Sequence, residues 1–263
     1  MNNEIKIAFF DVDWTLYDHQ NHRWSFKSIE AIKKLKKKGI KVVLCTARPY
    51  ESMKLFGLFD LGVDWDGFIS SAGACAYADG KFLRKTLIDA KEVKRFLALV
   101  KERNLTCEVV MPTSRILAFP QSKESEAYYQ VYIEKIPPAE EYKGEEVTGL
   151  NLFALESEDA IFQKEFPTFC FFRYAPFACD ISGEPHRKGD GIDVILEHFN
   201  LKEDDAIAFG DDIQDITMAG HVKTFVCMNN GKDEVKKVAS FVTKDVWDDG
   251  VYYALLHYGL IEE

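Results

Sequence analysis

No run of apolar residues in the sequence approaches the about 18–20 that a membrane-spanning helix requires. The start of the chain also lacks the basic segment and apolar core of a secretory signal peptide, so we expect neither a membrane span nor a signal peptide. There is no low-complexity tract and no repeat with the period of a solenoid. These absences predict a globular protein with no membrane partner.

Cysteine pairs are missing as well. The six cysteines are scattered, and no two of them form a C-x-x-C motif. Several stand within apolar runs, where buried free thiols are common. We therefore expect reduced cysteines and a cytoplasmic protein. The cysteines are Cys45, Cys75, Cys107, Cys170, Cys179 and Cys227.

The chain has fewer basic than acidic residues, which gives a formal net charge of −10 and a pI near 5.2. This balance argues against nucleic-acid and anionic-membrane partners. An anionic ligand would have to be captured locally, by a metal ion, a lysine and backbone N–H groups. The 263 residues can form one large domain or two modest ones, and the oligomeric state stays open.

The chain is organised around the segment 11–16, with the sequence DVDWTL, which follows the apolar run 5–10. Such a run predicts a buried parallel strand that carries polar residues at its carboxyl end, where open α/β sheets bind ligands. Asp11 and Asp13 point the same way along an extended backbone, so two carboxylates meet. A divalent cation, most plausibly Mg²⁺, relieves their repulsion. The alternative is a plain acidic turn after a strand.

After the first strand, residues 18–24 are polar and predict a loop. Ser25 can cap a helix with Ile29, Ile32 and Leu35 on one face, which leads to a second buried strand at 40–45. Strand, helix and strand in this order form a right-handed parallel unit, which brings Thr46 beside Asp11. A hydroxyl and free N–H groups at a strand-to-helix junction can bind phosphate. A simple helix N-cap is the alternative for Thr46.

From about Lys85 the pattern changes to two repeats of strand, helix and strand, which predicts a separate α/β domain. The doubly wound pattern resumes at Glu184. The predicted fold class is therefore α/β, with a Rossmann-like, doubly wound parallel sheet as the core (1–84 and 185–263) and an inserted α/β domain (85–184). The ends of strands and helices then deliver a hydroxyl, a lysine and several carboxylates to one edge, a set that suits phosphoryl transfer. These residues are Asp11, Asp13, Thr46, Lys188, Asp211 and Asp215.

Four motifs, DVDWTL, LCTARP, HRKGDGI and GDDIQD, occur in this order along the chain. In this the sequence resembles the haloacid dehalogenase-like (HAD) hydrolase superfamily, and most closely its Cof-type phosphatases, which carry a large α/β cap between the second and third motifs. The resemblance covers nearly the whole chain. It implies that the inserted domain, 85–184, is the cap that selects the substrate.

The resemblance also implies roles for individual residues. Asp11 would be the nucleophile that forms an aspartyl-phosphate, and Asp13 would protonate the leaving alkoxide and then deprotonate the attacking water. Thr46 and the N–H of Ala47 would hold the phosphoryl oxygens. Lys188 would neutralise both nucleophile and phosphate.

The remaining acidic residues of the motifs complete the implied site. Mg²⁺ would be held by Asp11, by Asp13 through its backbone carbonyl, and by Asp211. Asp215 would orient Lys188 from outside the set of metal ligands. Asp212 is either a similar supporting residue or a solvated turn aspartate.

Three positions depart from the family pattern. Trp14 stands where glycine is usual, Gln214 where asparagine is usual, and Ala72 replaces the asparagine of an N-G-A triplet. None of them removes the nucleophile, the acid–base residue or the lysine. Trp14 either alters the turn or lines the pocket.

Some further residues are weaker candidates for substrate contacts. Arg115 and Arg173 can meet an anionic or sugar substrate, with a surface salt bridge as the alternative. His186 either contacts the substrate or is an exposed hinge residue. Asn229 and Asn230 follow a strand end and either approach the phosphate or serve a turn.

The sequence thus predicts a Mg²⁺-dependent phosphatase that hydrolyses a small phosphorylated metabolite. Sugar phosphates are the leading substrate class, followed by phosphorylated cofactors such as pyridoxal phosphate or flavin mononucleotide. Two alternatives stay open: a phosphomutase-type phosphotransferase, and a non-catalytic ligand-binding protein on the same scaffold.

Overall fold

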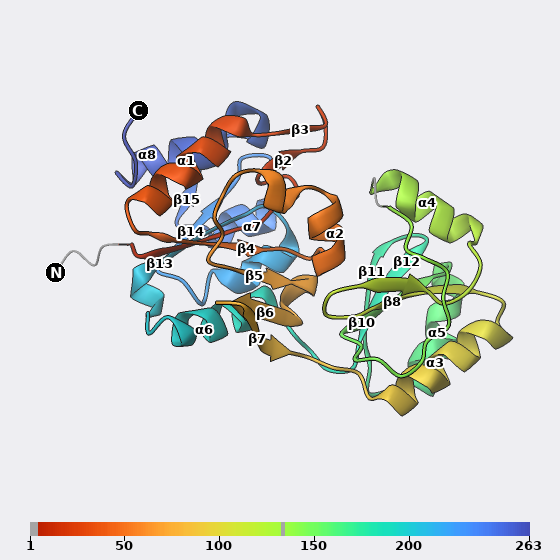
Figure 1. Cartoon of the computed structure of the whole chain (residues 1–263). Helices are drawn as coiled ribbons and strands as arrows, with labels where there is room; N and C mark the ends of the chain where they lie inside the picture. Colours follow the sequence, from red (N-terminus) through yellow and green to blue (C-terminus); the bar gives the residue numbers. More distant parts are fainter. Residues whose placement is uncertain (1–4, 133–134) are drawn as a thin grey trace. The chain divides into compact units, whose positions relative to one another are not determined.

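The structure is a computed structural model that describes residues 5–132 and 135–263. The chain forms two compact units. The first comprises the chain up to Ala47, Phe59–Arg84 and Arg187–Glu263, and the second comprises Arg48–Leu58 and Lys85–His186. Figure 1 shows that the N-terminal red and the C-terminal blue parts of the chain belong to one unit.

The first unit contains an eight-stranded sheet. Its strands run parallel from β15 to β5, and β6 pairs antiparallel with β5. The strands of the central pairs are fully buried, as parallel strands with covered faces must be. The eight strands of the sheet, in sheet order, are β15 (Phe241–Val242), β14 (Thr224–Cys227), β13 (Ala206–Gly210), β1 (Ile7–Phe10), β4 (Lys41–Cys45), β5 (Gly67–Ser70), β6 (Cys75–Ala78) and β7 (Lys81–Lys85).

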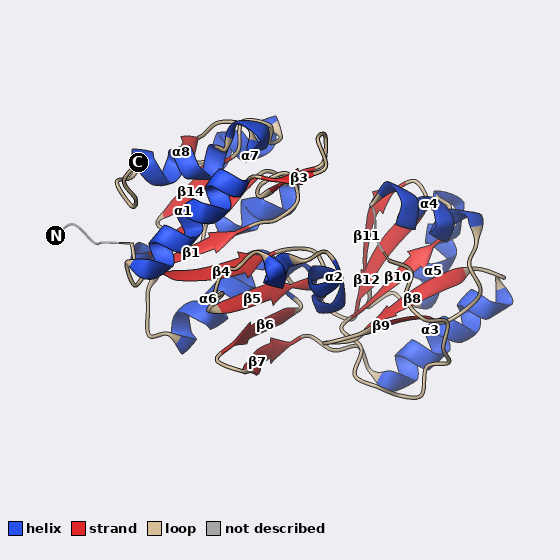
Figure 2. Cartoon of the chain, turned by 45° about the horizontal axis from the view of Figure 1, so that its top comes forward, coloured by secondary structure: helices blue, strands red, loops and turns tan. Residues whose placement is uncertain are grey.

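Helices lie on both faces of this sheet (Figure 2). On one face, Ile192 and Ile195 of α6 (Lys188–His198) and Val235 of α7 (Asp233–Val238) join a core cluster with inward residues of the strands. On the other face, α1 packs against α8. These two helices are α1 (Phe26–Lys37) and α8 (Gly250–His257).

The helix predicted after Ser25 is α1, and Ile29, Ile32 and Leu35 are its buried face. Ser25 makes no side-chain capping bond, contrary to the prediction. Its Oγ lies 2.7 Å from the Oδ1 of Asp249 and 2.7 Å from the Oγ of Ser28. The hydroxyl thus bonds two other side chains instead of capping the helix.

The segment 18–24 was expected to be a loop, and this expectation is wrong. β2 (Tyr17–Asp18) and β3 (Arg23–Trp24) form a short antiparallel hairpin. The buried carboxylate of Asp18 accepts N–H bonds from Gln20 at 3.0 Å and Asn21 at 3.1 Å, which fixes the turn. Although burial opposes the charge, hydrogen bonds from Asn21 lower the pKa of Asp18.

The second unit contains a five-stranded antiparallel sheet. Phe96 of α3 packs with Phe162 and Phe166 against one face, with ring centroids 5.0 and 5.1 Å away. The strands, in sheet order, are β11 (Cys170–Ala175), β12 (Ala178–Ser182), β10 (Gly149–Phe153), β8 (Thr106–Val110) and β9 (Arg115–Leu117). The helices are α2 (Tyr50–Leu55), α3 (Ala90–Glu102), α4 (Lys123–Val131) and α5 (Asp159–Glu165).

The predicted fold class, a doubly wound α/β core with an inserted α/β domain, is confirmed. Among the helices that the structure describes, none combines the length and the apolar character needed to cross a membrane. None of the six cysteines forms a disulfide, and all but Cys170 are buried.

Candidate active site

The candidate site begins where three adjacent strands end. Asp11, Thr46 and Asp211 directly follow β1, β4 and β13, which lie side by side in the sheet. The N–H of Asp11 donates to the carbonyl of Phe209 at 3.0 Å, and the N–H of Thr46 donates to that of Ile69 at 2.9 Å. These bonds extend the sheet pattern past the strands, so the sheet fixes the positions of Asp11 and Thr46.

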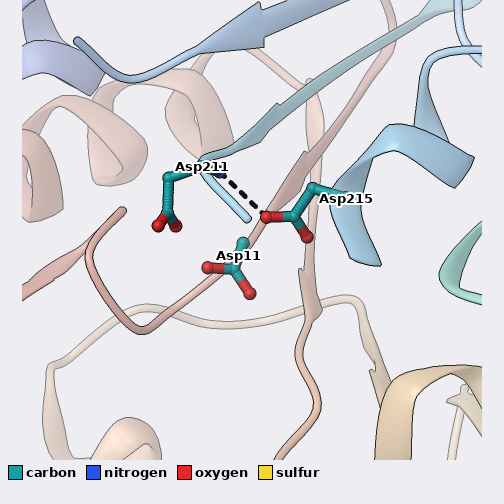
Figure 3. A group of neighbouring side chains, drawn as sticks. All are labelled: Asp11, Asp211 and Asp215. Atoms are coloured by element: carbon teal, nitrogen blue, oxygen red, sulfur yellow. Dashed lines mark hydrogen bonds between the residues drawn. The ribbon is translucent and has the colours of Figure 1, made fainter. Parts of the chain in front are cut away.

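Three buried carboxylates converge at this edge (Figure 3). One oxygen of each of Asp11, Asp211 and Asp215 lies within 4.8 Å of the others. Their residues are 6%, 7% and 0% exposed. Such a group cannot be stable without positive charge close by, because burial removes the water that would solvate it.

Lys188 supplies part of that charge. It is the first residue of α6, and its Nζ lies 2.6 Å from Asp11 Oδ1 and 2.6 Å from Asp215 Oδ1. The side chain is 3% exposed. One ammonium thus faces three carboxylates, which leaves two negative charges within this group of four when all are ionised.

The electrostatics of the group reflect this imbalance. Burial raises the pKa of Asp11 to about 7, opposed by Lys188 and assisted by Asp215. Burial and the nearby Asp11 also hold the pKa of Asp211 well above its usual value. Burial disfavours the charged form of Lys188, yet Asp11 and Asp215 together hold its pKa well above the ordinary value.

The donor set fits a divalent cation. Carboxylate oxygens are the ligands that hard cations such as Mg²⁺ prefer, and a charge of +2 balances the two remaining negative charges. Asp11 and Asp211 have oxygens available for this purpose. Thr15 donates its hydroxyl to Asp211 Oδ1 at 3.0 Å and so fixes the direction of that carboxylate.

Asp215 is held differently. Its Oδ2 accepts the N–H groups of Asp211 at 2.8 Å and Asp212 at 2.9 Å, while its Oδ1 contacts Lys188. Gly210 allows this close approach, because a Cβ there would lie 2.6 Å from the carboxyl of Asp215. Both oxygens are therefore already engaged, which suits a residue that orients Lys188.

A family model for haloacid dehalogenase-like hydrolases matches residues 8–255, nearly the whole chain. The chain belongs to this family. The fold and the buried Asp–Lys cluster at the carboxyl ends of the parallel strands agree with that assignment.

The YkrA protein of Bacillus subtilis (strain 168) is 28% identical over 268 residues, covering 98% of this chain and 100% of that protein. Phosphoglycolate phosphatase 1 of Saccharolobus solfataricus is 25% identical over 248 residues, covering 94% and 92%. The solved structure of the HAD subclass IIB sugar phosphatase BT4131 has a TM-score of 0.80 and 28% identity, covering 97% of this chain and 100% of that chain. These relatives confirm the predicted enzyme class, a HAD-like phosphatase.

Within this HAD chain, Asp13 is not one of the three clustered buried carboxylates. Its Oδ1 instead lies 2.6 Å from Nε2 of His19, and its side chain is 33% exposed. Trp14, which follows it, has a positive φ of 64°. The turn after Asp13 thus keeps the left-handed backbone conformation that glycine adopts most easily.

Thr46 is buried, and the exposed Ala47 follows it. The carbonyl of Thr46 accepts the N–H of Ala72 at 3.1 Å, so Ala72 supports the strand end through its backbone. The alternative that Thr46 is a helix N-cap is wrong, because α2 begins at Tyr50 and has Pro49 as its N-cap. For the same reason, no helix N-terminus starts at Thr46.

Asp212 lies outside the buried group. It accepts the N–H of Ile213 at the start of the 3₁₀ helix Ile213–Met218, and it pairs with Lys232 at 2.9 Å. Both partners of that ion pair are about half exposed, at 52% and 54%. This geometry favours the solvated turn aspartate among the two alternatives.

The weaker candidates mostly serve the fold. Arg173 pairs with Asp159, and Asn230 donates to the carbonyl of Trp14 at 2.9 Å. For Arg115 the alternative of a surface salt bridge is wrong, because its side chain is 1% exposed and its Nη1 lies 3.3 Å from Glu108 Oε1. The ion pair of Arg115 with Glu108 therefore lies in the interior of the second unit.

Sequence reasoning assigned no role to two residues at this site, Thr15 and His19. Thr15 belongs to the DVDWTL segment itself, so a hydroxyl close to the two aspartates in the sequence was a usable signal. His19 had no such signal, because its contact with Asp13 depends on the unexpected hairpin.

Burial raises the pKa of the Cys45 thiol, so this neighbour of Thr46 is not an activated nucleophile.

Proposed function

We propose that this HAD-family protein is a Mg²⁺-dependent phosphatase that hydrolyses small phosphomonoesters through an aspartyl-phosphate on Asp11. The observation that carries the proposal is the contact of Lys188 with Asp11 at 2.6 Å beside two further buried carboxylates. A nucleophile must be ionised and fixed, and Lys188 favours both. Asp215 holds Lys188 in place through its second contact.

In the proposed reaction, Asp11 attacks phosphorus while the bond to the leaving oxygen breaks. Asp13 gives that oxygen its proton and later takes a proton from the water that hydrolyses the aspartyl-phosphate. Lys188 neutralises charge on the phosphoryl oxygens, and Thr46 and the N–H of Ala47 hold them.

Mg²⁺ is proposed as the cation, held by Asp11, Asp211 and the backbone carbonyl of Asp13. When bound, it would neutralise phosphoryl oxygens and bring phosphate and nucleophile together. The surplus of two buried negative charges supports a divalent ion. The hydroxyl of Thr15 would keep Asp211 directed toward that ion.

The substrate is proposed to be a small phosphorylated metabolite, with sugar phosphates as the leading class. The similarity to a sugar phosphatase structure over 97% of the chain supports this choice. We also propose that the inserted domain, 85–184, is a cap that selects the substrate. The cysteines, which form no disulfide and are mostly buried, support a cytoplasmic location.

The test is phosphate release from a panel of phosphorylated metabolites with Mg²⁺ present. Asp11→Asn should abolish turnover and leave the circular dichroism spectrum unchanged, whereas the exposed control Asp64→Asn should turn over like the wild type. EDTA should abolish phosphate release by the wild type, and added Mg²⁺ should restore it. Turnover by Asp11→Asn would refute covalent catalysis by Asp11.

A phosphotransferase of phosphomutase type remains the second candidate, because it would use the same Asp11 and Lys188. The panel separates the two, since a phosphatase releases inorganic phosphate and a mutase converts one sugar phosphate into its isomer. We expect phosphate release without isomer formation.

A further inference from the structure

His19 is a well-packed neighbour of the Asp13 side chain. A third of this side chain is exposed, and Oδ1 lies 2.6 Å from Nε2 of His19, whose own side chain is only 15% exposed. An exposed carboxylate ordinarily samples several rotamers, and a catalytic acid must be held in one. His19 is therefore placed to restrict Asp13.

The ring of His19 is itself fixed by aromatic neighbours of the β2–β3 hairpin. Its centroid lies 4.9 Å from the ring of Tyr17, at an interplanar angle of 79°, and 5.2 Å from the ring of Trp14. Tyr17 in turn packs edge-on against Trp24, at 4.9 Å and 70°. Such edge-to-face pairs favour one ring orientation.

Trp14 holds its position at an energetic cost. Its φ of 64° lies in the left-handed region, which is strained for a residue with a Cβ. The peptide is locked on both sides, because its N–H donates to Tyr17 at 2.9 Å and its carbonyl accepts the Asn230 amide at 2.9 Å. Strain that surrounding contacts maintain is typical of functional sites.

We propose that His19 is a positioning residue that holds the carboxyl of Asp13 for acid–base catalysis, and this rests on the proposed function. With His19 on Oδ1, Oδ2 is the oxygen that gives the proton to the leaving group as the P–O bond breaks and the bond from Asp11 to phosphorus forms. The same oxygen then takes a proton from the attacking water. The role requires a hydrogen bond and no change in the charge of His19.

Two substitutions separate the hydrogen bond from the packing. His19→Phe keeps an aromatic ring against Trp14 and Tyr17 and removes both nitrogens. His19→Gln loses the ring and keeps an N–H donor. His198→Phe is the matched control, because it removes a similar contact with Asp79 at 2.8 Å elsewhere in the first unit.

The assay compares kcat/KM for 4-nitrophenyl phosphate with that for the best alkyl phosphate of the panel. A nitrophenolate leaves without a proton, whereas an alkoxide needs one, so only the alkyl substrate depends on the acid in the first step. We expect His19→Phe to lower kcat/KM for the alkyl phosphate by about 10–100-fold and for the aryl phosphate by less than about 3-fold. His19→Gln should recover most of the alkyl activity, and His198→Phe should resemble the wild type.

Two reference variants distinguish failure of this inference from failure of the proposed function. Asp13→Asn should show the same selective loss in stronger form, and Asp11→Asn should be inactive on both substrates. If Asp13→Asn shows the selective loss and His19→Phe loses nothing, or loses equally on both substrates, only the role of His19 is overturned. If Asp11→Asn turns over, the proposed function fails and this inference fails with it.

Discussion

The buried carboxylate of Asp11 is expected to destabilise the protein that it makes active. In metal-free protein at about pH 8, Asp11→Asn should therefore raise the melting temperature while it abolishes turnover. An amide has nearly the shape of a protonated carboxyl and cannot ionise. The substitution also leaves Lys188 paired with Asp215 at 2.6 Å, so the buried ammonium keeps a partner.

The magnitude follows from the shift of the Asp11 pKa, from 3.8 to about 7. The folded protein binds more protons than the unfolded chain between these two values, so its stability falls as the pH rises from about 4 to about 7. A shift of about three units corresponds to about 4 kcal/mol above pH 7 and to about 2 kcal/mol near pH 5. Asp11→Asn removes this loss of stability, so the difference in unfolding free energy between the variant and the wild type should grow with pH.

The assay is thermal unfolding in EDTA at about pH 5 and about pH 8, with Asp64→Asn as a control for the Asp→Asn change at a side chain that is 89% exposed. An advantage of about 4 kcal/mol corresponds to a rise of roughly 8–16 °C in a chain of this size. Mg²⁺ should narrow the gap, because it stabilises the wild type more. Equal melting temperatures at pH 8, or a gap that does not shrink at pH 5, would refute the reasoning.

Two further substitutions test how the site and the second unit are built. Gly210→Ala places a Cβ 2.6 Å from Asp215, so we expect kcat to fall about 100-fold as Lys188 loses its fixed partner. Gly220→Ala is the control and should keep the wild-type kcat, because no atom lies within 4 Å of a Cβ built at Gly220. Equal kcat values for the two variants would contradict this role of Gly210. Glu108→Gln should lower stability by about 1–3 kcal/mol in thermal unfolding, because the buried Glu108 accepts the Tyr129 hydroxyl at 2.6 Å; an unchanged melting temperature would argue against this.

The central part of the candidate site could be predicted from sequence because strand topology determines it. Asp11, Asp211 and Lys188 are far apart along the chain, yet each directly follows a buried strand or begins a helix of a doubly wound fold. In a parallel sheet such positions meet at one edge whatever the loops do. The contact of Lys188 with Asp11, across 177 positions of sequence, follows from this rule.

The parts that sequence reasoning missed depend on contacts with no periodic signal. The β2–β3 hairpin has strands of two residues each, too short for a pattern of alternation. Arg115 is buried because β8 and β9 pair so that Val110 faces Arg115, which places Glu108 diagonally across on the same face. That register is a property of the folded sheet and could not be read from the residues alone.

The two proposed catalytic aspartates are thus held by different physical means. Asp11 is buried at the end of a central strand, where the whole sheet fixes it and where its charge costs stability. Asp13 lies two residues later, partly in solvent, where the sheet no longer determines the side chain and local contacts must do so. A group that exchanges protons with substrate and water needs this exposure, and His19 supplies at Asp13 the restriction that burial supplies at Asp11.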